Sequence, residues 1–160
     1  EALLNYAEAR AELGEITQSD LDLTVNKLRD RVAMPHLRLD NIVHDPQWDY
    51  PTLSPIINEI RRERRVELAF EGLRLHDFLR WRAHHLVVGK RSLGATFVPE
   101  DYPEMEEGVN VYTTNGYIDA HQKALPNGYG FKPDRDYLNP IPTMELTLND
   151  KYYQNPGWLD

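Results

Sequence analysis

Three tyrosines, spaced along one stretch with carboxylates and amides between them, are suited to ligand-binding chemistry. These are Tyr102, Tyr112 and Tyr117, and their polar neighbours are Asp101, Asn110, Asn115 and Asp119. Proteins recognise sugars with flat aromatic faces and with side chains that bond hydroxyl groups. The pattern therefore indicates carbohydrate binding, and Trp48 with Tyr50 forms a second candidate pair. Alternatively, these rings anchor irregular loops, which is the more common role of aromatic residues in such segments.

A densely charged stretch is the other chemical signal in the chain. Residues 59–71 hold four Glu and four Arg, and the five consecutive charges at 61–65 sweep more than one helical turn. They cannot all face water if any side of this helix is packed, so some must be paired, with local partners at helical spacing. We expect a structural ion network made of Glu63, Arg64, Glu67, Glu71, Arg74, Asp77 and Arg80.

The sequence predicts no catalytic residues. Glycoside hydrolysis needs two carboxylates across a cleft, one of them with a raised pKa. Glu104, Glu106 and Glu107 crowd on one segment, while the glutamates of residues 59–71 have arginine neighbours that keep them ionised. The histidines lack metal-ligand spacing, and no phosphate-binding glycine loop or nucleophile elbow is present, so we expect neither a metal nor a cofactor.

Composition narrows the possible partners. A net charge of -8 over 160 residues disfavours nucleic acid, which needs a basic face. No apolar run is long enough to cross a membrane, and the absence of cysteine excludes disulfides and any lipidated cysteine within these residues. The chain opens at Glu1 with a helix-forming stretch and no preceding cap, so we expect it to be part of a longer protein.

Apolar spacing predicts a mainly α fold that begins with a helical hairpin at residues 1–33. The first helix ends at Gly14, and the second is capped by Thr17 or Ser19 and stops before Pro35. This arrangement is similar to one tetratricopeptide hairpin, although only one copy is visible. Its apolar positions are Leu3, Leu4, Ala7, Ala11, Leu13, Leu21, Val25, Leu28 and Val32.

The remaining segments follow from turn and proline signals. A loop at residues 34–53 leads to a charged helix pair at 54–88, which begins with Ser54 as the cap and Pro55 in the first turn. Periodicity then disappears in a loop insertion at 89–133. Prolines predict an extended clasp at 134–160, with a short helical turn near residues 143–146. All four parts are expected to belong to one domain.

Taken together, these features resemble the C-terminal part of the RagB/SusD family of outer-membrane nutrient-binding lipoproteins from Bacteroidetes. The residues that carry the resemblance are Tyr6–Ala9 with Leu13–Gly14, Asn26–Arg31 before Pro35, Ile60–Arg74, Asp77, Arg80–Trp81, Leu138–Pro142, Glu145–Leu146 and Gln154–Gly157. Their order and spacing extend over nearly the whole chain. The sequence departs from the family pattern at Asn139, at Asn149–Lys151 and at Trp158.

The resemblance implies a helical scaffold at the cell-surface side of the outer membrane. Such a protein captures an oligosaccharide or similar nutrient and passes it unchanged to a SusC-like TonB-dependent transporter. It reaches the membrane only through a lipid anchor outside this chain, and most sugar-contacting residues are expected upstream. Two alternatives are a helical-repeat adaptor that binds protein, based on the hairpin, and a glycoside hydrolase.

Overall fold

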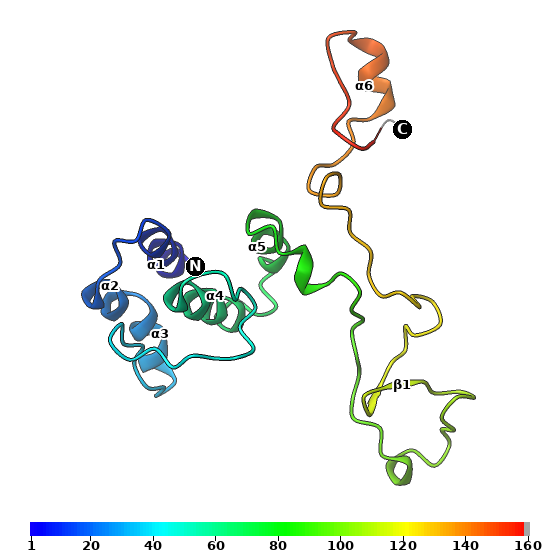
Figure 1. The fold of residues 1–160 in the computed structure, drawn as a ribbon, viewed down its shortest axis with the longest axis horizontal. Coiled ribbons are helices and arrows are strands. Elements are labelled where there is room, and N and C mark those ends of the chain that lie inside the picture. Colours follow the sequence, from blue (N-terminus) through cyan, green and yellow to red (C-terminus); the bar gives the residue numbers. More distant parts are fainter. Residues whose placement is uncertain (159–160) are drawn as a thin grey trace. The chain divides into compact units, whose positions relative to one another are not determined.

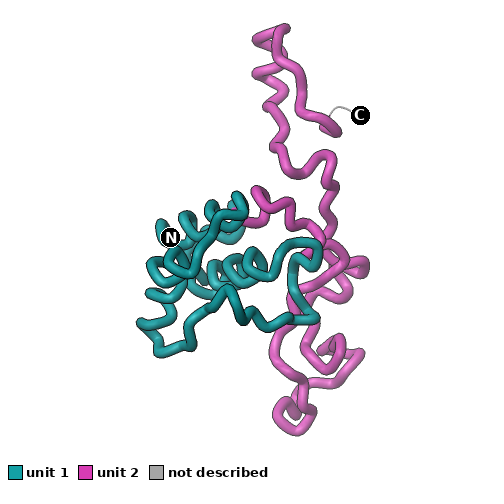
Figure 2. The backbone as a smooth tube through the Cα atoms, turned by 60° about the vertical axis from the view of Figure 1, so that its left-hand side comes forward, with its two compact units in different colours: residues 1–76 teal, residues 77–160 magenta. Residues whose placement is uncertain are grey.

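The computed structural model describes residues 1–158, and the chain divides into two compact units. Unit 1 comprises Glu1–His76 and unit 2 comprises Asp77–Asp160 (Figure 2). The described part is mostly helical, with one small two-stranded sheet, which confirms the mainly α fold class predicted from the sequence.

Unit 1 begins with α1 (Ala2–Glu12), which ends where the sequence predicted. Gly14 takes a left-handed conformation (φ +70°), in which a side chain would strain the backbone. This conformation lets the Gly14 N–H donate to the Ala11 carbonyl and the Glu15 N–H donate to the Arg10 carbonyl, both at 3.0 Å. The two bonds form a Schellman motif, which satisfies carbonyls that the end of the helix leaves open.

The second helix of the hairpin is divided in two, where the sequence pattern predicted one continuous helix. α2 (Gln18–Leu23) begins with a capping box between Thr17 and Asp20, and α3 (Val25–Arg31) follows after Thr24. The backbone at Thr24 leaves helical geometry (φ −124°, ψ −90°), and its hydroxyl donates to the Asp20 carbonyl at 2.6 Å. A threonine bonded back in this way competes with the helical ladder, which accounts for the break.

α4 (Pro55–Glu67) completes unit 1 and packs beside α1, as Figure 1 shows. Pro55 occupies the first turn, whereas the Ser54 side chain forms no capping bond. The core between these helices consists of Leu4, Ala7, Ala11, Leu21, Val25, Leu37, Ile60 and Leu68. Leu37 belongs to the long loop between α3 and α4, so this loop contributes to the core and is held close to both helices.

Unit 2 has little regular structure in its first part. α5 (Arg74–Arg80) begins in unit 1 and runs into unit 2, where the short 3-10 turns η1 (His84–Leu86) and η2 (Pro99–Asp101) follow. The predicted loop insertion contains a small antiparallel hairpin of β1 (Thr113–Thr114) and β2 (Tyr117–Ile118). Rings from distant positions also pack together here, since Phe131 lies 4.7 Å from Tyr137 and 5.5 Å from Phe78, measured between centroids.

The clasp at residues 134–158 is held by side chains that bond its backbone. The Gln154 side chain accepts from the Ile141 N–H at 2.7 Å and donates to the Ile141 carbonyl at 2.8 Å. The Trp158 indole N–H donates to the Leu138 carbonyl at 2.9 Å. These bonds bring the two ends of the clasp together around α6 (Thr143–Leu148), which is longer than the predicted turn. Prolines at positions 140 and 142 keep this backbone out of a sheet.

Candidate functional site

The loop at residues 34–53 and the polar face of α4 form the candidate site in unit 1. Two buried asparagines hold this loop in place. Asn26 accepts from the Leu37 N–H at 2.7 Å and donates to the Leu37 carbonyl at 3.1 Å. Asn58 does the same with Tyr50, accepting from its N–H at 3.1 Å and donating to its carbonyl at 2.8 Å. Each amide thus satisfies both backbone groups of one loop residue, as a neighbouring β-strand would.

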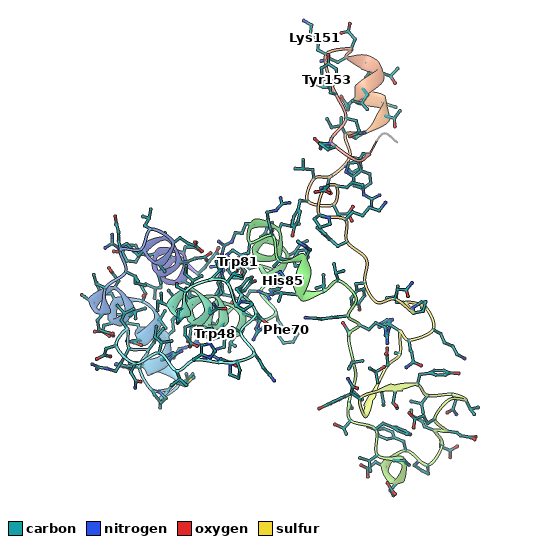
Figure 3. The ribbon with its side chains drawn as sticks, in the orientation of Figure 1. Trp48, Phe70, Trp81, His85, Lys151 and Tyr153 are labelled. Atoms are coloured by element: carbon teal, nitrogen blue, oxygen red, sulfur yellow. The ribbon has the colours of Figure 1, made fainter. Side chains whose placement is uncertain are left out.

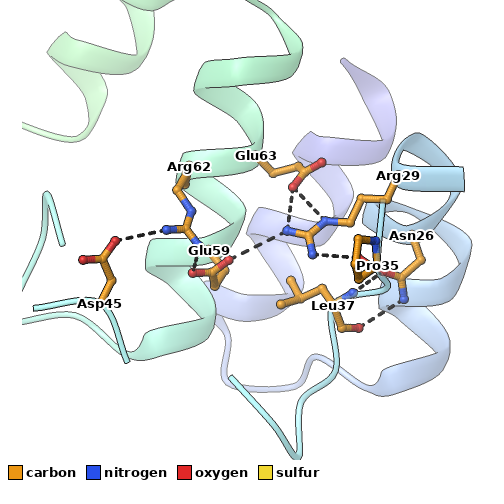
Figure 4. A network of polar contacts seen from close by, with 8 residues as sticks. All are labelled: Asn26, Arg29, Pro35, Leu37, Asp45, Glu59, Arg62 and Glu63. Carbon is orange, nitrogen blue, oxygen red and sulfur yellow. Dashed lines mark hydrogen bonds and ion pairs between the residues drawn. The ribbon is translucent and has the colours of Figure 1, made fainter. Parts of the chain in front are cut away.

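Arginine side chains hold the same loop at two further points, Pro35 and Asp45 (Figure 4). Arg29 of α3 donates from Nε and Nη2 to one Glu63 oxygen at 2.9 and 2.8 Å, and its Nη1 donates to the Pro35 carbonyl at 3.1 Å. Arg62 of α4 donates to Asp45 at 3.1 Å and also to buried Glu59. The charged face of α4 is therefore occupied by partners from α3 and from the loop, which fixes the path of the loop.

A recess of about 300 Å³ lies between the first half of the loop and the charged residues. Pro35, Leu37 and Ile42 contribute apolar atoms to its wall, and Arg29, Glu59 and Arg62 contribute polar ones. The volume lies at the lower end of the range for small-molecule pockets. Apolar walls with a few oriented polar groups suit a sugar residue better than a purely apolar ligand.

A second hollow, of about 40 Å³, adjoins Trp48 and Tyr50 and shares Arg62 with the recess. This volume accommodates about one water molecule. The Trp48 indole nitrogen is buried and has no hydrogen-bond partner among the described residues, and the Trp48 ring lies 4.6 Å from the ring of His44. A buried indole donor that lacks a protein acceptor is suited to a water or to a ligand oxygen at this point.

Tyr50 has a different environment from Trp48, although the two are close in sequence. Only 6% of Tyr50 is exposed, and the Arg61 guanidinium lies 4.5 Å from the centre of its ring. Burial raises the pKa of Tyr50. One face of the ring is thus covered by Arg61, so the Tyr50 ring supports the loop, whereas Trp48 is the partly exposed ring of the pair.

The three tyrosines of the other candidate group lie in unit 2. Tyr102 stacks on Phe97 with ring centroids 5.8 Å apart, and the Lys123 ammonium lies 4.2 Å from the Tyr112 ring. The Tyr112 hydroxyl donates to the Gly108 carbonyl at 3.0 Å. Tyr117, in β2, is exposed. Two of these rings therefore have intramolecular partners on a face, and Tyr117 presents more of its surface to solvent.

The β-hairpin beside these tyrosines is held by a buried carboxylate. Asp119 accepts from Arg91 Nε at 2.8 Å and from the Thr114 hydroxyl at 2.7 Å. Burial raises the pKa of Asp119, but the hydrogen bonds from Thr114 and Arg91 outweigh it and hold the pKa below its usual range. An ionised, paired carboxylate of this kind is a structural anchor and has the wrong protonation state for a general acid.

The remaining network residues join different parts of the fold. Arg64 is buried on α4 and donates to the Asn5 side chain of α1 at 2.7 Å. Glu67 pairs with Arg31 of α3 at 2.7 Å. Asp77 and Arg80 pair with each other within α5. Glu71 is exposed after the end of α4, and Arg74 is half-buried at the start of α5. Most partners of α4 thus come from other helices.

Several residues that position the site have only a weak local signal in the sequence. Asn26 and Asn58 are single asparagines within helices, and nothing in their spacing separates them from surface residues. Arg29 stood out only as part of a charged run before Pro35. Their one available cue is position: Asn26 adjoins the apolar series of Leu21, Val25 and Leu28, which predicts proximity to the core.

Among the described residues, no cluster of three or more histidine, aspartate or glutamate side chains is arranged to hold a metal ion. In the same residues, no helix has the length and apolar character needed to cross a bilayer.

Comparison with known proteins places the chain in a family. The profile of the SusD family, which also carries the name RagB, matches residues 1–158, so this chain belongs to the SusD family. The solved structure of BT4246 is similar, with a TM-score of 0.65 and 30% sequence identity. The match covers 98% of this chain and 22% of that chain, so this chain spans about a fifth of its length. No curated protein matches the chain.

Proposed function

We propose that this chain is the C-terminal part of a non-catalytic, SusD-like outer-membrane protein. The protein captures oligosaccharides or similar nutrients at the cell surface and delivers them to a SusC-like TonB-dependent transporter. It is held at the membrane by a lipid on a cysteine outside this chain. The observation that carries the proposal is the family match over residues 1–158.

The geometry of unit 1 supports a binding role over a catalytic one. The recess beside the loop has mixed apolar and polar walls, and the carboxylates near it are engaged by arginine. Glycoside hydrolysis needs two carboxylates that face each other across a cleft, whereas these carboxylates are paired with arginine. We assign Trp48, whose hollow shares Arg62 with the recess, as a ring at the edge of the site that contacts a sugar, with Tyr50 as its buried support. Tyr117 is the exposed ring available in unit 2.

Binding by the full-length protein tests the first half of the proposal. Isothermal titration calorimetry against a panel of neutral oligosaccharides should identify a ligand. Trp48→Ala should weaken the binding of that ligand by about tenfold, because one stacked ring contributes about 1.4 kcal/mol. Tyr153→Ala, at an exposed tyrosine of the clasp, is the matched control and should leave affinity unchanged. Failure of every oligosaccharide to bind would reject nutrient capture as stated.

Association with a transporter tests the second half separately. The full-length protein should co-purify with a TonB-dependent transporter after mild detergent extraction, and Trp48→Ala should leave this association intact. Isolation of the protein without any such partner, under conditions that preserve other outer-membrane complexes, would reject delivery even if a sugar were bound.

A further inference from the structure

The indole N–H of Trp48 is a buried hydrogen-bond donor in the loop of unit 1 (Figure 3). Its nitrogen is shielded from solvent, and no described residue accepts a hydrogen bond from it. The corresponding donor of Trp158 is paired, since it donates to the Leu138 carbonyl at 2.9 Å. Because a buried donor without an acceptor is unfavourable, Trp48 calls for an acceptor that the described residues do not supply.

The loop around Trp48 holds the ring in place. The Trp48 backbone N–H donates to the Asp45 carbonyl at 3.3 Å, and the Gln47 N–H donates to the Asp45 carboxylate at 2.8 Å. These two bonds form a tight turn that ends at Trp48. Two residues further on, the Tyr50 backbone is bonded to Asn58. The indole is therefore fixed from both sides and has little freedom to reach an acceptor elsewhere.

The hollow of about 40 Å³ beside this ring, which we call the Trp48 hollow, is small and has balanced charges. Its volume suits about one water-sized group and excludes a whole sugar ring. Two carboxylates and two guanidinium groups line it, and they are paired, Arg62 with Asp45 and Arg65 with Asp49 (Figure 4 shows the first pair). An ion would compete with these pairs, whereas a neutral group leaves them intact.

Hydrogen-bonding capacity narrows the occupant further. An ionised carboxylate can accept about four hydrogen bonds, and the described bonds to Asp45, from Arg62 and from the Gln47 N–H, use two of them. The occupant must accept from the indole and can also donate to a carboxylate. A carbonyl group accepts but cannot donate, and an ammonium ion donates but cannot accept. A hydroxyl group does both.

We propose that the Trp48 hollow is a binding site for one hydroxyl group, which accepts from Trp48 Nε1 and donates to the carboxylate of Asp45 or Asp49. Water and sugars share this chemistry. A water molecule occupies the site in the free protein. Because the hollow and the recess share Arg62, a sugar held in the recess replaces this water with one of its own hydroxyl groups. Only the replacement by a sugar rests on the proposed function.

A high-resolution crystal structure of the full-length protein tests the site directly. We expect an ordered oxygen within hydrogen-bond distance of Trp48 Nε1 and of a carboxylate oxygen of Asp45 or Asp49. Trp48→Phe removes the donor but keeps an aromatic ring, so it should lose this oxygen while the pair between Arg62 and Asp45 persists. The proposal would be overturned by an ion in the hollow, by an indole that donates to a protein atom, or by an indole without any oxygen neighbour.

Crystals grown with glucose in excess identify the source of the hydroxyl group. Glucose is neutral, and its polar groups are hydroxyls and one ring oxygen. A glucose hydroxyl in the Trp48 hollow would support replacement by a sugar, whereas a retained water would restrict the site to water and overturn that replacement. If no oligosaccharide of the calorimetric panel bound while the ordered water was present, nutrient capture would be rejected and the water site would stand.

The indole N–H signals give a second readout in solution, independent of crystal packing. In the full-length protein with isotope-labelled tryptophan, the Trp48 N–H should show a nuclear Overhauser effect from a long-lived water, and Trp48→Phe assigns the signal. The Trp158 N–H, which donates to a protein carbonyl, is the matched control and should show an effect several times weaker. Equal effects at the two indoles, or none at Trp48, would contradict the proposal.

Discussion

Arg29 and Glu63, which lie 34 positions apart, are joined by two hydrogen bonds from the guanidinium of α3 to a single carboxylate oxygen of α4. Both side chains are largely shielded from water. The pair therefore connects two helices that the chain itself connects only through the long loop at residues 34–53. Because Arg29 also donates to the Pro35 carbonyl, the same side chain holds the start of that loop.

A double-mutant cycle on this pair should show strong coupling. Glu63→Ala should lower the free energy of unfolding by up to about 3 kcal/mol, since it leaves a shielded arginine with only the longer ion pair to Glu59, at 3.8 Å, and the bond to the Pro35 carbonyl. Arg29→Ala should cost about 1 kcal/mol more, because the bond to Pro35 is also lost. The double variant should be little worse than Arg29→Ala alone. Urea denaturation measures all three, and strictly additive losses would show that the residues do not interact.

Arg64 and Glu67 should differ in their effect on stability, although both are charged residues of α4. Arg64 is 4% exposed and donates to Asn5, so Arg64→Ala should cost about 3 kcal/mol. Glu67 pairs with Arg31, whose side chain is 64% exposed, so Glu67→Ala should cost less than about 1 kcal/mol. Equal losses in denaturant midpoint for the two variants would contradict this difference. High salt should remove only the Glu67 effect.

Asn58 should be essential for the path of the loop. Asn58→Leu keeps the branched shape and the number of side-chain heavy atoms but leaves both backbone groups of Tyr50 without their partner, and it should cost about 3 kcal/mol. Asn41→Leu, the same substitution at an exposed position of the loop, is the control and should have almost no effect. Amide hydrogen exchange at Tyr50 should also accelerate in Asn58→Leu, and an unchanged rate would contradict the assigned bond.

The capping aspartate of α2 should make stability depend on pH in a narrow acidic range. Hydrogen bonds from the Thr17 side chain and backbone lower the pKa of Asp20 to about 2. Because the pKa is lower in the folded state than the unfolded value of about 3.9, the stabilisation is complete above pH 4 and is lost as the pH falls toward 2. Asp20→Asn should reduce the slope of unfolding free energy against pH across this range. A slope equal to that of the unsubstituted protein would show that Asp20 does not cause the pH dependence of stability.

Two glycines with similar backbone angles should respond differently to alanine. At Gly14 an added Cβ meets no atom within 4 Å, so Gly14→Ala should cost only the left-handed strain of about 1 kcal/mol. At Gly128 the same atom would lie 2.4 Å from the Gly89 carbonyl carbon, where two backbone segments cross. Gly128→Ala should therefore cost several times more than Gly14→Ala. Similar melting temperatures for the two variants would show that the crossing can relax.

The ends of the first helices could be predicted from the sequence where a residue close to each end determined it. Gly14 ended the first helix, and Thr17 capped the second, because both signals act within a few residues. The break at Thr24 could not be predicted, since a threonine hydroxyl bonds back to the helix only in a particular local conformation. The Gly89–Gly128 crossing is a long-range contact, which spacing alone does not reveal.

The candidate site followed from the sequence only in part. The many charged residues between positions 59 and 71 predicted ion pairs. Their helical spacing led us to expect the partners within the same helix. In the structure Glu59 and Arg62 pair within α4 as expected, whereas Glu63 bonds to Arg29 and Arg64 bonds to Asn5, from other helices. Helical spacing identifies neighbours along one helix, whereas these pairs depend on how α1 and α3 pack against α4. The roles of Asn26 and Asn58 likewise depend on where the loop lies.

The way Asn26 and Asn58 hold the loop has a consequence for how the exposed surface of the loop can change over evolutionary time. Within the loop both amides bond only main-chain atoms, those of Leu37, Tyr50 and Leu53, so they place no demand on the side chains between these points. Exposed positions such as Arg38, Asn41 and Val43 are then free to vary while the loop keeps its course. Related proteins with the same interior amides can thus acquire a different loop surface by exchanging exposed residues alone.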